Sequence, residues 1–263
     1  MDAIPLLVMT KPFGALSPGR LAETLATLGA DGAELVVRDG QTATPAEPAR
    51  LREVAAELTR HGLRLGVVTT DLVEADGTAE EILRGCAELG VPLVRLGWWR
   101  YDATEGYHRI QDRARRDLAA LAGLGRRHGV RLALQLHHGT IHPSAAHALR
   151  LTEELDVYLD PGNQAMESSE QLSMSLDLLG DRVACVGVKN VAWRDAGPQW
   201  QPLADGGVVD WPATLRSLRA RGYAGPLSLH AHYPMADPVA DVGRDLTHLR
   251  EVISLPGSAT VRP

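Results

Sequence analysis

Cysteine and bulky aromatic residues are scarce in this chain of 263 residues. It has two cysteines, Cys86 and Cys185, one phenylalanine and five tryptophans. Two cysteines are too few for a disulfide framework, so we expect both thiols to serve packing and the protein to reside in a reducing compartment, the cytoplasm. Because aromatic residues make up only 4% of the chain, aliphatic side chains must fill most of the core.

Long apolar runs and a concentration of positive charge are also missing. Nowhere do about 18 apolar residues follow one another, and no basic leader precedes the short apolar run at the start, so neither membrane insertion nor export is expected. The formal net charge of −6 arises from interspersed acids and bases. Because nucleic acid binding needs a basic stripe, this pattern argues against nucleic acid as a partner.

What the chain does contain is an alternation of short apolar runs with segments whose apolar residues lie three and four positions apart. The runs predict strands over residues 5–9, 33–37, 64–68, 93–97, 130–136, 157–159, 183–188 and 226–229. The intervening segments predict helices over residues 17–28, 45–61, 78–89, 103–128, 143–151, 168–179, 211–221 and 238–253. Since the runs are nearly continuous, we expect strands that are covered on both faces, as in a parallel sheet.

Eight strand–helix units in a chain of this length predict one (β/α)8 TIM barrel, an α/β fold of a single domain. We expect the barrel to span residues 1–255 and residues 256–263 to form a C-terminal tail. Ser17 and Pro18 mark the start of the first helix. Five helices are predicted to end at a glycine, namely Gly29, Gly62, Gly90, Gly129 and Gly222. A doubly wound open sheet is the alternative, but no glycine-rich phosphate turn follows the first strand, which also argues against a nucleotide cofactor.

Five segments, read in order, carry a family resemblance. They are GADGAEL at 29–35, GVRLALQLHHG at 129–139, VYLDPGN at 157–163, VACVGVKNVAW at 183–193 and GVVDWPATLRSLRARGYAGPLSL at 207–229. The chain resembles the xylose-isomerase-like TIM barrel superfamily, which includes sugar and sugar-phosphate isomerases and epimerases. The resemblance extends over nearly the whole chain and implies a barrel with a small-molecule site where the strands end.

The resemblance also implies a divalent metal at the strand ends, held by acids and a histidine, that polarises a hydroxyl and carbonyl pair. On strand five, Gln135 replaces the family's Glu, whereas the His two positions later is kept as His137. On strand six the Asp is kept as Asp160, and Asn163 stands where a His often follows. The first half of the implied ligand set is therefore only partly preserved.

The second half departs further from the family pattern. The strand-seven His falls on Gly187, the Lys-Asp pair that follows reads Lys189-Asn190, and the strand-eight Glu falls on His230. A single carboxylate remains, and Mg²⁺ prefers anionic oxygen ligands, so this set argues against tightly bound Mg²⁺.

Two interpretations of the metal site stay open. Zn²⁺ or Mn²⁺ could be held by Asp160, Gln135 and His230, and zinc could also use His137 or His232, because catalytic zinc accepts mixed nitrogen and oxygen ligands. The alternative is a metal-free pocket.

Lys189 and His230 are the predicted acid and base. Lys189 ends an apolar strand, and a buried ammonium requires a partner such as Asp160 or a substrate anion. Burial would lower its pKa and allow it to exchange protons near neutral pH. We expect Asp160, followed by a Pro-Gly-Asn turn, to face the barrel mouth and orient the substrate, and His137 to be a third catalytic candidate.

Alternation along the strands predicts which side chains face the pocket. Gln135 and His137 should point to one side and His138 to the other, while His230 and His232 should share a side. The predicted substrate-binding residues are Glu34, Trp98, Arg100, Gln135, Asn163 and His232. Trp99 and Tyr101 could extend a stacking wall around the anion clamp of Arg100, and Lys11 and Phe13 are further candidates.

These residues predict an isomerase or epimerase that moves a proton at a carbon next to a carbonyl in a sugar-like polyol or hydroxy-ketone. A lyase or dehydratase needs the same proton abstraction and is the first alternative. A non-catalytic, metabolite-binding barrel is the second, motivated by the lost acidic ligands. An endonuclease is disfavoured by the acidic net charge, and homo-oligomerisation stays open.

Overall fold

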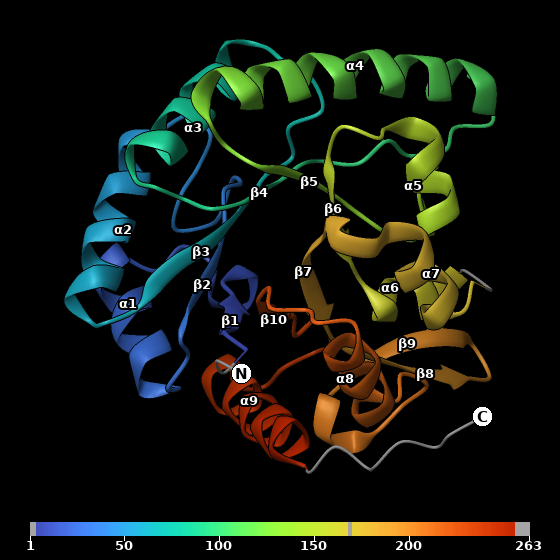
Figure 1. Ribbon diagram of the computed structural model, residues 1–263. Helices are drawn as coiled ribbons and strands as arrows, with labels where there is room; N and C mark the ends of the chain where they lie inside the picture. The colour runs from blue at the N-terminus through green and yellow to red at the C-terminus, as the bar shows by residue number, and fades with distance from the viewer. Residues whose placement is uncertain (1–3, 168–169, 256–263) are drawn as a thin grey trace.

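The computed structural model describes residues 4–167 and 170–255. Its barrel strands are β1 (Leu6–Met9), β2 (Gly32–Val36), β3 (Arg64–Thr69), β4 (Val94–Arg95), β5 (Leu132–Gln135), β6 (Asp156–Leu159), β7 (Val183–Val188) and β10 (Leu227–Leu229). They are parallel and close in the order β1-β10-β7-β6-β5-β4-β3-β2, with helices around them (Figure 1). The predicted (β/α)8 TIM barrel is confirmed, and the expected tail, 256–263, lies outside the described residues.

Helices cover the outer face of the barrel. They are α1 (Pro18–Thr27), α2 (Ala49–Arg60), α3 (Gly77–Glu88), α4 (Tyr107–His128), α5 (Ala145–Leu151), α6 (Pro161–Glu167), α7 (Leu172–Leu179), α8 (Trp211–Ala220) and α9 (Pro238–Ser254), with short 3-10 turns η1 (Lys11–Phe13), η2 (Gly180–Arg182) and η3 (Leu203–Asp205). The longest, α4, buries Ile110, Ala114 and Leu118, which lie four positions apart on the face towards the sheet.

Local signals explain where several helices begin. The Ser17 hydroxyl accepts the backbone N–H of Arg20 at the predicted start of α1. The predicted helix from 45 starts only at Ala49, because Pro48 fits the beginning of a helix but not its interior. The predicted helix from 103 starts at Tyr107, after Gly106 with a φ of 82°. Of the helix predicted over 168–179, the described part is α7, and residues 168–169 lie outside the described ranges.

Two elements differ from the sequence prediction. The turn expected after Asp160 is wrong: α6 begins there, with Pro161 at its first position and the Asp160 carboxylate accepting the Asn163 backbone N–H at 2.9 Å. An antiparallel hairpin, β8 (Asn190–Arg194) and β9 (Gly197–Gln201), also follows β7 without having been predicted. It carries Trp200 to the barrel mouth.

The lower half of the barrel interior is filled by side chains. The inner cluster consists of Leu7, Val67, Leu93, Ala133, Tyr158, Ala184 and Cys185. Leu7 packs so closely that a Cβ at Gly66 would lie 2.7 Å from its Cδ1. This packing fills the middle of the barrel, so the side chains of the carboxyl-terminal mouth rest on an apolar floor.

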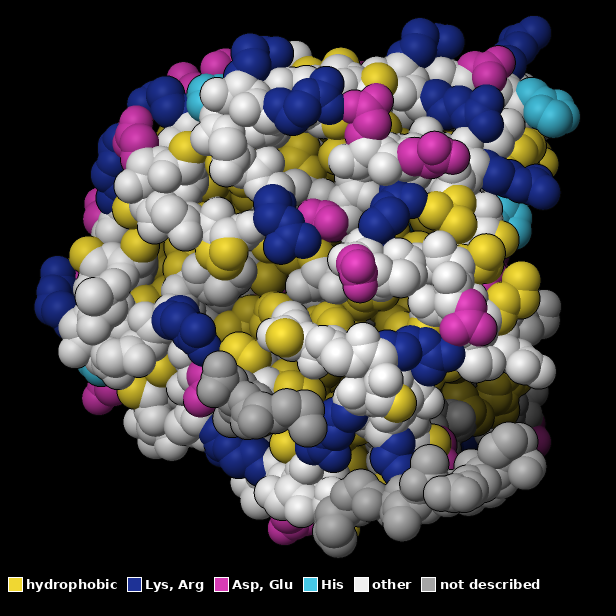
Figure 2. Space-filling model, in the orientation of Figure 1, with side chains coloured by type: hydrophobic (Ala, Val, Ile, Leu, Met, Phe, Trp, Pro, Cys, Tyr) yellow, Lys and Arg dark blue, Asp and Glu magenta, His cyan; other side chains and the backbone are white. Residues whose placement is uncertain are grey.

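Surface and burial agree with the composition. Basic and acidic side chains are interspersed on the face shown in Figure 2, and both Cys86 and Cys185 are buried. Among the residues described, none of the helices combines the length and the apolar character that a bilayer crossing requires.

Candidate active site

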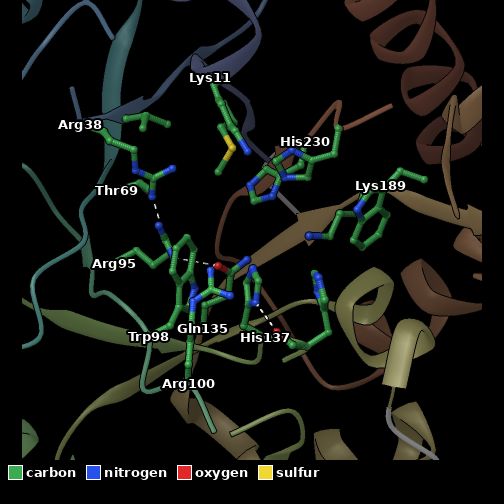
Figure 3. A pocket seen from close by; sticks show the side chains of 15 residues that line it. Lys11, Arg38, Thr69, Arg95, Trp98, Arg100, Gln135, His137, Lys189 and His230 are labelled. Atoms are coloured by element: carbon green, nitrogen blue, oxygen red, sulfur yellow. Dashed lines mark hydrogen bonds between the residues drawn. The ribbon is translucent and has the colours of Figure 1, made fainter. Parts of the chain in front are cut away.

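A cavity of about 350 Å³ opens at the carboxyl ends of the strands (Figure 3). Its polar lining is dominated by nitrogen: five basic side chains, Lys11, Arg38, Arg95, Arg100 and Lys189, and four histidines, His137, His138, His230 and His232. The described residues that line it include no Asp or Glu. Two buried carboxylates, Glu34 and Asp160, lie behind this lining and hold the basic groups in place.

His230 is fixed from one side of its ring. Its Nε2 lies 2.9 Å from Glu34 Oε2 and 2.8 Å from the Tyr158 hydroxyl, which itself donates to Glu34. Burial alone would raise the pKa of Glu34, but the charge and hydrogen bond of His230 outweigh this effect and the pKa is lowered to about 2. The ionised Glu34 can only accept, so Nε2 carries a proton.

The other ring nitrogen of His230 makes no hydrogen bond to the described part of the protein. Its Nδ1 is buried and has no hydrogen-bond partner among the described residues, and it lies 4.0 Å from Asp160 Oδ2. Because the bond to Glu34 holds the proton on Nε2, the neutral form of His230 has its lone pair on Nδ1, and in this form the ring presents a base to the cavity that it lines.

Lys189 lies beside the same aspartate. Its Nζ is 3.0 Å from Asp160 Oδ2 and 2.8 Å from Asn163 Oδ1, and it stands 4.5 Å above the Trp200 ring. Burial lowers the pKa of Lys189, and the charge of Asp160 opposes this shift. An ammonium has three N–H donors, so one remains for a ligand in the cavity.

The geometry does not fit the metal that the resemblance implied. Asp160 Oδ2 is already bonded to Lys189 and, at 2.7 Å, to Gln135 Nε2, while Gln135 Oε1 accepts from Arg95 at 3.0 Å. The third predicted ligand, His230, is already bonded to Glu34 through Nε2, and the described residues contain no group of three or more His, Cys, Asp or Glu side chains that could hold an ion. The Lys189 ammonium therefore binds the Asp160 carboxylate, which is the anionic ligand that a divalent cation would need at this site.

The strand-seven position shows why no ligand can be added there. A Cβ built on Gly187 would lie 2.9 Å from Asp160 Oδ2 and 3.1 Å from the Tyr158 ring. The absence of a side chain at Gly187 thus makes room for Asp160 to turn towards Lys189.

His137 and His138 stack on each other with ring centroids 4.5 Å apart. His137 Nδ1 donates to the His138 carbonyl at 2.7 Å, so its Nε2 is the acceptor. Burial and then the charge of Lys189 lower the pKa of His137 to about 2, so the ring is neutral. The predicted opposite orientation of the two rings is wrong: β5 ends at Gln135, and both histidines line the cavity.

Two predicted substrate-binding residues lie outside the lining. Glu34 and Asn163 are fully buried. Asn163 Nδ2 donates to the Leu136 carbonyl, and its Oδ1 accepts from Lys189 and His138. The side-chain atoms of Asn163 are therefore occupied by hydrogen bonds that hold two lining residues in place. The Glu34 carboxylate holds His230 in the same way.

The remaining sequence candidates divide between cavity and core. Trp98, Arg100, Gln135 and His232 line the cavity, as does Lys11. Three others do not. Trp99 is buried and donates to Asp117, Phe13 is part of the core, and Tyr101 is 57% exposed.

The lining residues missed from the sequence include two that are charged and one that is aromatic. Arg95 is a charged residue inside the apolar run VPLVRLG, and that break in the pattern was the available signal. Arg38 lies two residues after the end of β2, at the end of the strand that forms the mouth. Trp200 belongs to the hairpin, whose sequence GPQWQ gave no strand signal.

Comparison with known proteins assigns the fold to a family. The family described as Xylose isomerase-like TIM barrel matches residues 22–252. The chain belongs to this family. None of the curated protein sequences matches the chain.

Three solved structures illustrate the similarity of this family member to known barrels. The 3-keto-D-glucoside 4-epimerase YcjR from E. coli has a TM-score of 0.75 at 17% identity, over 95% of this chain and 100% of that one. The probable 3-DHS dehydratase AsbF from Bacillus anthracis has a TM-score of 0.74 at 14% identity, over 94% and 99%. A xylose isomerase-like TIM barrel protein from Mycobacterium smegmatis, in complex with magnesium, has a TM-score of 0.72 at 15% identity, over 95% and 97%. At these identities the similarity shows the shared fold.

Proposed function

We propose that the protein is an isomerase or epimerase that moves a proton at a carbon next to a carbonyl in a small sugar-like polyol or hydroxy-ketone of the cytoplasm. The observation that carries this proposal is the buried, unpartnered Nδ1 of His230, oriented by Glu34 through Nε2. A cavity of about 350 Å³ is within the range of small-molecule sites.

The reaction needs a base, and a donor for the oxygen on which charge develops. His230 Nδ1 removes the proton from carbon, and the electron pair of the broken C–H bond moves towards the carbonyl to give an enolate. The Lys189 ammonium donates to the enolate oxygen. Return of a proton to the same carbon from the opposite face gives the epimer. For the isomer, the former carbonyl oxygen gains a proton, the neighbouring hydroxyl loses its proton to become the new carbonyl, and the proton on His230 returns to the former carbonyl carbon.

Lys189 is suited to both parts of this role. Its lowered pKa makes the ammonium a stronger acid than an exposed lysine, while Asp160 keeps a proton on it. Since Lys189 Nζ lies 3.0 Å and His230 Nδ1 4.0 Å from Asp160 Oδ2, the acid and the base are held next to the same carboxylate. No step in this scheme requires a metal.

A dehydratase is the second candidate. The same proton abstraction, followed by loss of a hydroxyl from the next carbon, gives an unsaturated product. The similarity to a structure named as a probable dehydratase supports keeping this outcome in the assay.

Substitution of the acid and base tests the proposal. With a substrate found by screening ketoses and their acids, Lys189→Met and His230→Ala should each lower kcat by about 10²-fold or more, the usual contribution of a positioned acid or base. His248→Ala on α9, whose side chain is 36% exposed, is the matched control and should keep full activity. If both variants fold and turn over at wild-type rates, the assignment of Lys189 and His230 as acid and base is wrong. If the wild-type protein binds such compounds but turns none of them over, a barrel that binds its ligand without catalysis becomes the better interpretation.

A further inference from the structure

The cavity has two sides of different chemistry. His230 and Lys189 come from the ends of β10 and β7, whereas Arg38, Arg95, Trp98 and Arg100 belong to β4 or follow β2 and β4 on the other side of the barrel (Figure 3). The proposed proton transfer uses only the first side. The residues of the second side and Lys11, which follows β1 between the two sides, have no part in it. We call these five residues the Trp98 cluster (Lys11, Arg38, Arg95, Trp98 and Arg100).

Arg95 is a buried cation without a carboxylate partner. Only 1% of the residue is exposed, and its guanidinium donates to Thr69 Oγ1, Gln135 Oε1 and the Thr70 carbonyl, at 3.1, 3.0 and 3.3 Å, all neutral acceptors. No carboxylate of the described residues lies within the 4.0 Å of an ion pair. Burying an unpaired charge is costly, so a group retained in this state needs a compensating anion.

The nearest acid does not fill this place. Glu34 reaches Arg95 only through Thr69, whose hydroxyl donates to Glu34 and accepts from Arg95. Glu34 is also committed to His230 and Tyr158. Two N–H donors of the Arg95 guanidinium are therefore left for the cavity that it lines.

Three guanidinium groups converge on the Trp98 ring. The carbon atoms of Arg95, Arg38 and Arg100 lie 4.8, 5.3 and 5.8 Å from its centroid. Arg38 is neutralised by a bidentate pair with Asp71, but Arg100 forms no ion pair within the described ranges. The Trp98 Nε1 is buried and has no hydrogen-bond partner there either. Among the described residues, hydrogen-bond donors without a partner and guanidinium groups without a counter-ion therefore lie together around the Trp98 ring.

Lys11, which follows β1, adds a further positive charge next to these guanidinium groups. Burial lowers its pKa, and repulsion by Arg38 and Arg95 lowers it further. Like charges held this close are stabilised when an anion binds between them.

We propose that the Trp98 cluster binds an anionic oxygen group of the substrate, a carboxylate or a phosphate, so that the protein acts on a sugar acid or a sugar phosphate and not on a neutral sugar. The forked donors of Arg95 and Arg100 match two oxygens of such a group. The rest of the molecule then extends across the cavity to Lys189 and His230. This inference rests on the proposed function for the reacting end, but the anion site can be tested without turnover.

Calorimetric titration at low ionic strength tests the site with two matched pairs of probes. D-ribulose 5-phosphate is compared with D-ribulose, and D-galacturonate with D-galactose. At least one anionic probe should bind about 10-fold more tightly than its neutral partner, as expected for charge-assisted hydrogen bonds, and added salt should reduce the difference. The pair with the larger difference identifies phosphate or carboxylate as the group.

Variants locate the effect. Arg100→Met removes an exposed side chain and Arg95→Met a buried one, and each should remove most of the preference for the anionic probe. Arg109→Met, an exposed arginine on α4 outside the cavity, is the control and should leave the preference intact. Equal affinities within both pairs, no binding of either anion, or a preference that survives both cavity substitutions would overturn the inference. Anion binding without any proton exchange would instead leave the site standing and overturn the proposed function.

Discussion

His142 gives the protein a built-in sensitivity to acid. Its Nδ1 donates to the Gln135 carbonyl at 2.9 Å, and its Nε2 accepts the Trp99 backbone N–H at 3.3 Å, so the buried ring is neutral. Burial lowers the pKa of His142 from 6.5 to about 4. A proton on Nε2 would break the bond from Trp99 and place an unpaired charge in the core beneath the cavity wall.

The size and sign of the effect follow from this pKa. Between pH 6.5 and 4 the unfolded chain binds a proton at this position and the folded state does not, so stability is lost as the pH falls through this window. The full shift corresponds to about 3 kcal/mol in the free energy of unfolding, since one pKa unit is worth about 1.4 kcal/mol.

Urea unfolding at a series of pH values measures this contribution. The His142→Asn variant can be less stable throughout, but its free energy of unfolding should fall less steeply than that of the wild type, by about 3 kcal/mol over the window. His137, whose pKa is lowered to about 2, accounts for part of the slope that remains. The exposed His108 is the control, and His108→Gln should reproduce the wild-type slope. An unchanged slope in His142→Asn would refute the reasoning.

Three further predictions concern the site and the frame that carries it. Glu34→Gln should fold, because the amide keeps the shape of the side chain and one acceptor. Since Glu34 orients the His230 ring, the variant should lower kcat by about 10²-fold or more and leave KM little changed. A change in KM with an unchanged kcat would contradict this. Tyr158→Phe keeps the Glu34–His230 bond and should cost less, as measured by the same kinetics. Leu118→Ala on the buried face of α4 should lower the free energy of unfolding by about 2–5 kcal/mol in urea titration without changing the pH profile of kcat.

The frame of the protein could be predicted from the sequence because each signal was local. Apolar runs separated by segments of helical period determine strands and helices, and Gly129, with a φ of 68° at the end of α4, marks a helix end that favours glycine. Once the barrel is recognised, residues directly after strands must meet at its mouth. Lys189, His230 and His137, which all follow strands, do line one cavity.

The sequence could not show which of these polar side chains face the cavity and which bond to one another behind its lining. Asp160 and Asn163 were expected to face the ligand, but α6 turns both inward and Lys189 covers them. Arg95 was overlooked because a strand pattern treats a basic residue as outward-facing. Its direction depends on neighbouring strands, where Thr69 and Gln135 supply its acceptors, and such long-range pairing leaves no local trace.

Proton exchange without metal tests the central claim most directly. The protein is stripped with EDTA, placed in D₂O with the anionic sugar that binds best, and the deuterium on the carbon next to the carbonyl is followed by NMR. We expect the wild-type protein to exchange this proton as fast with the chelator as without it, and the rate to fall by about 10²-fold or more in His230→Ala. Exchange that disappears with EDTA and returns on adding Mg²⁺, Mn²⁺ or Zn²⁺ would contradict it, because the ammonium of Lys189 would then not be the group that stabilises the enolate.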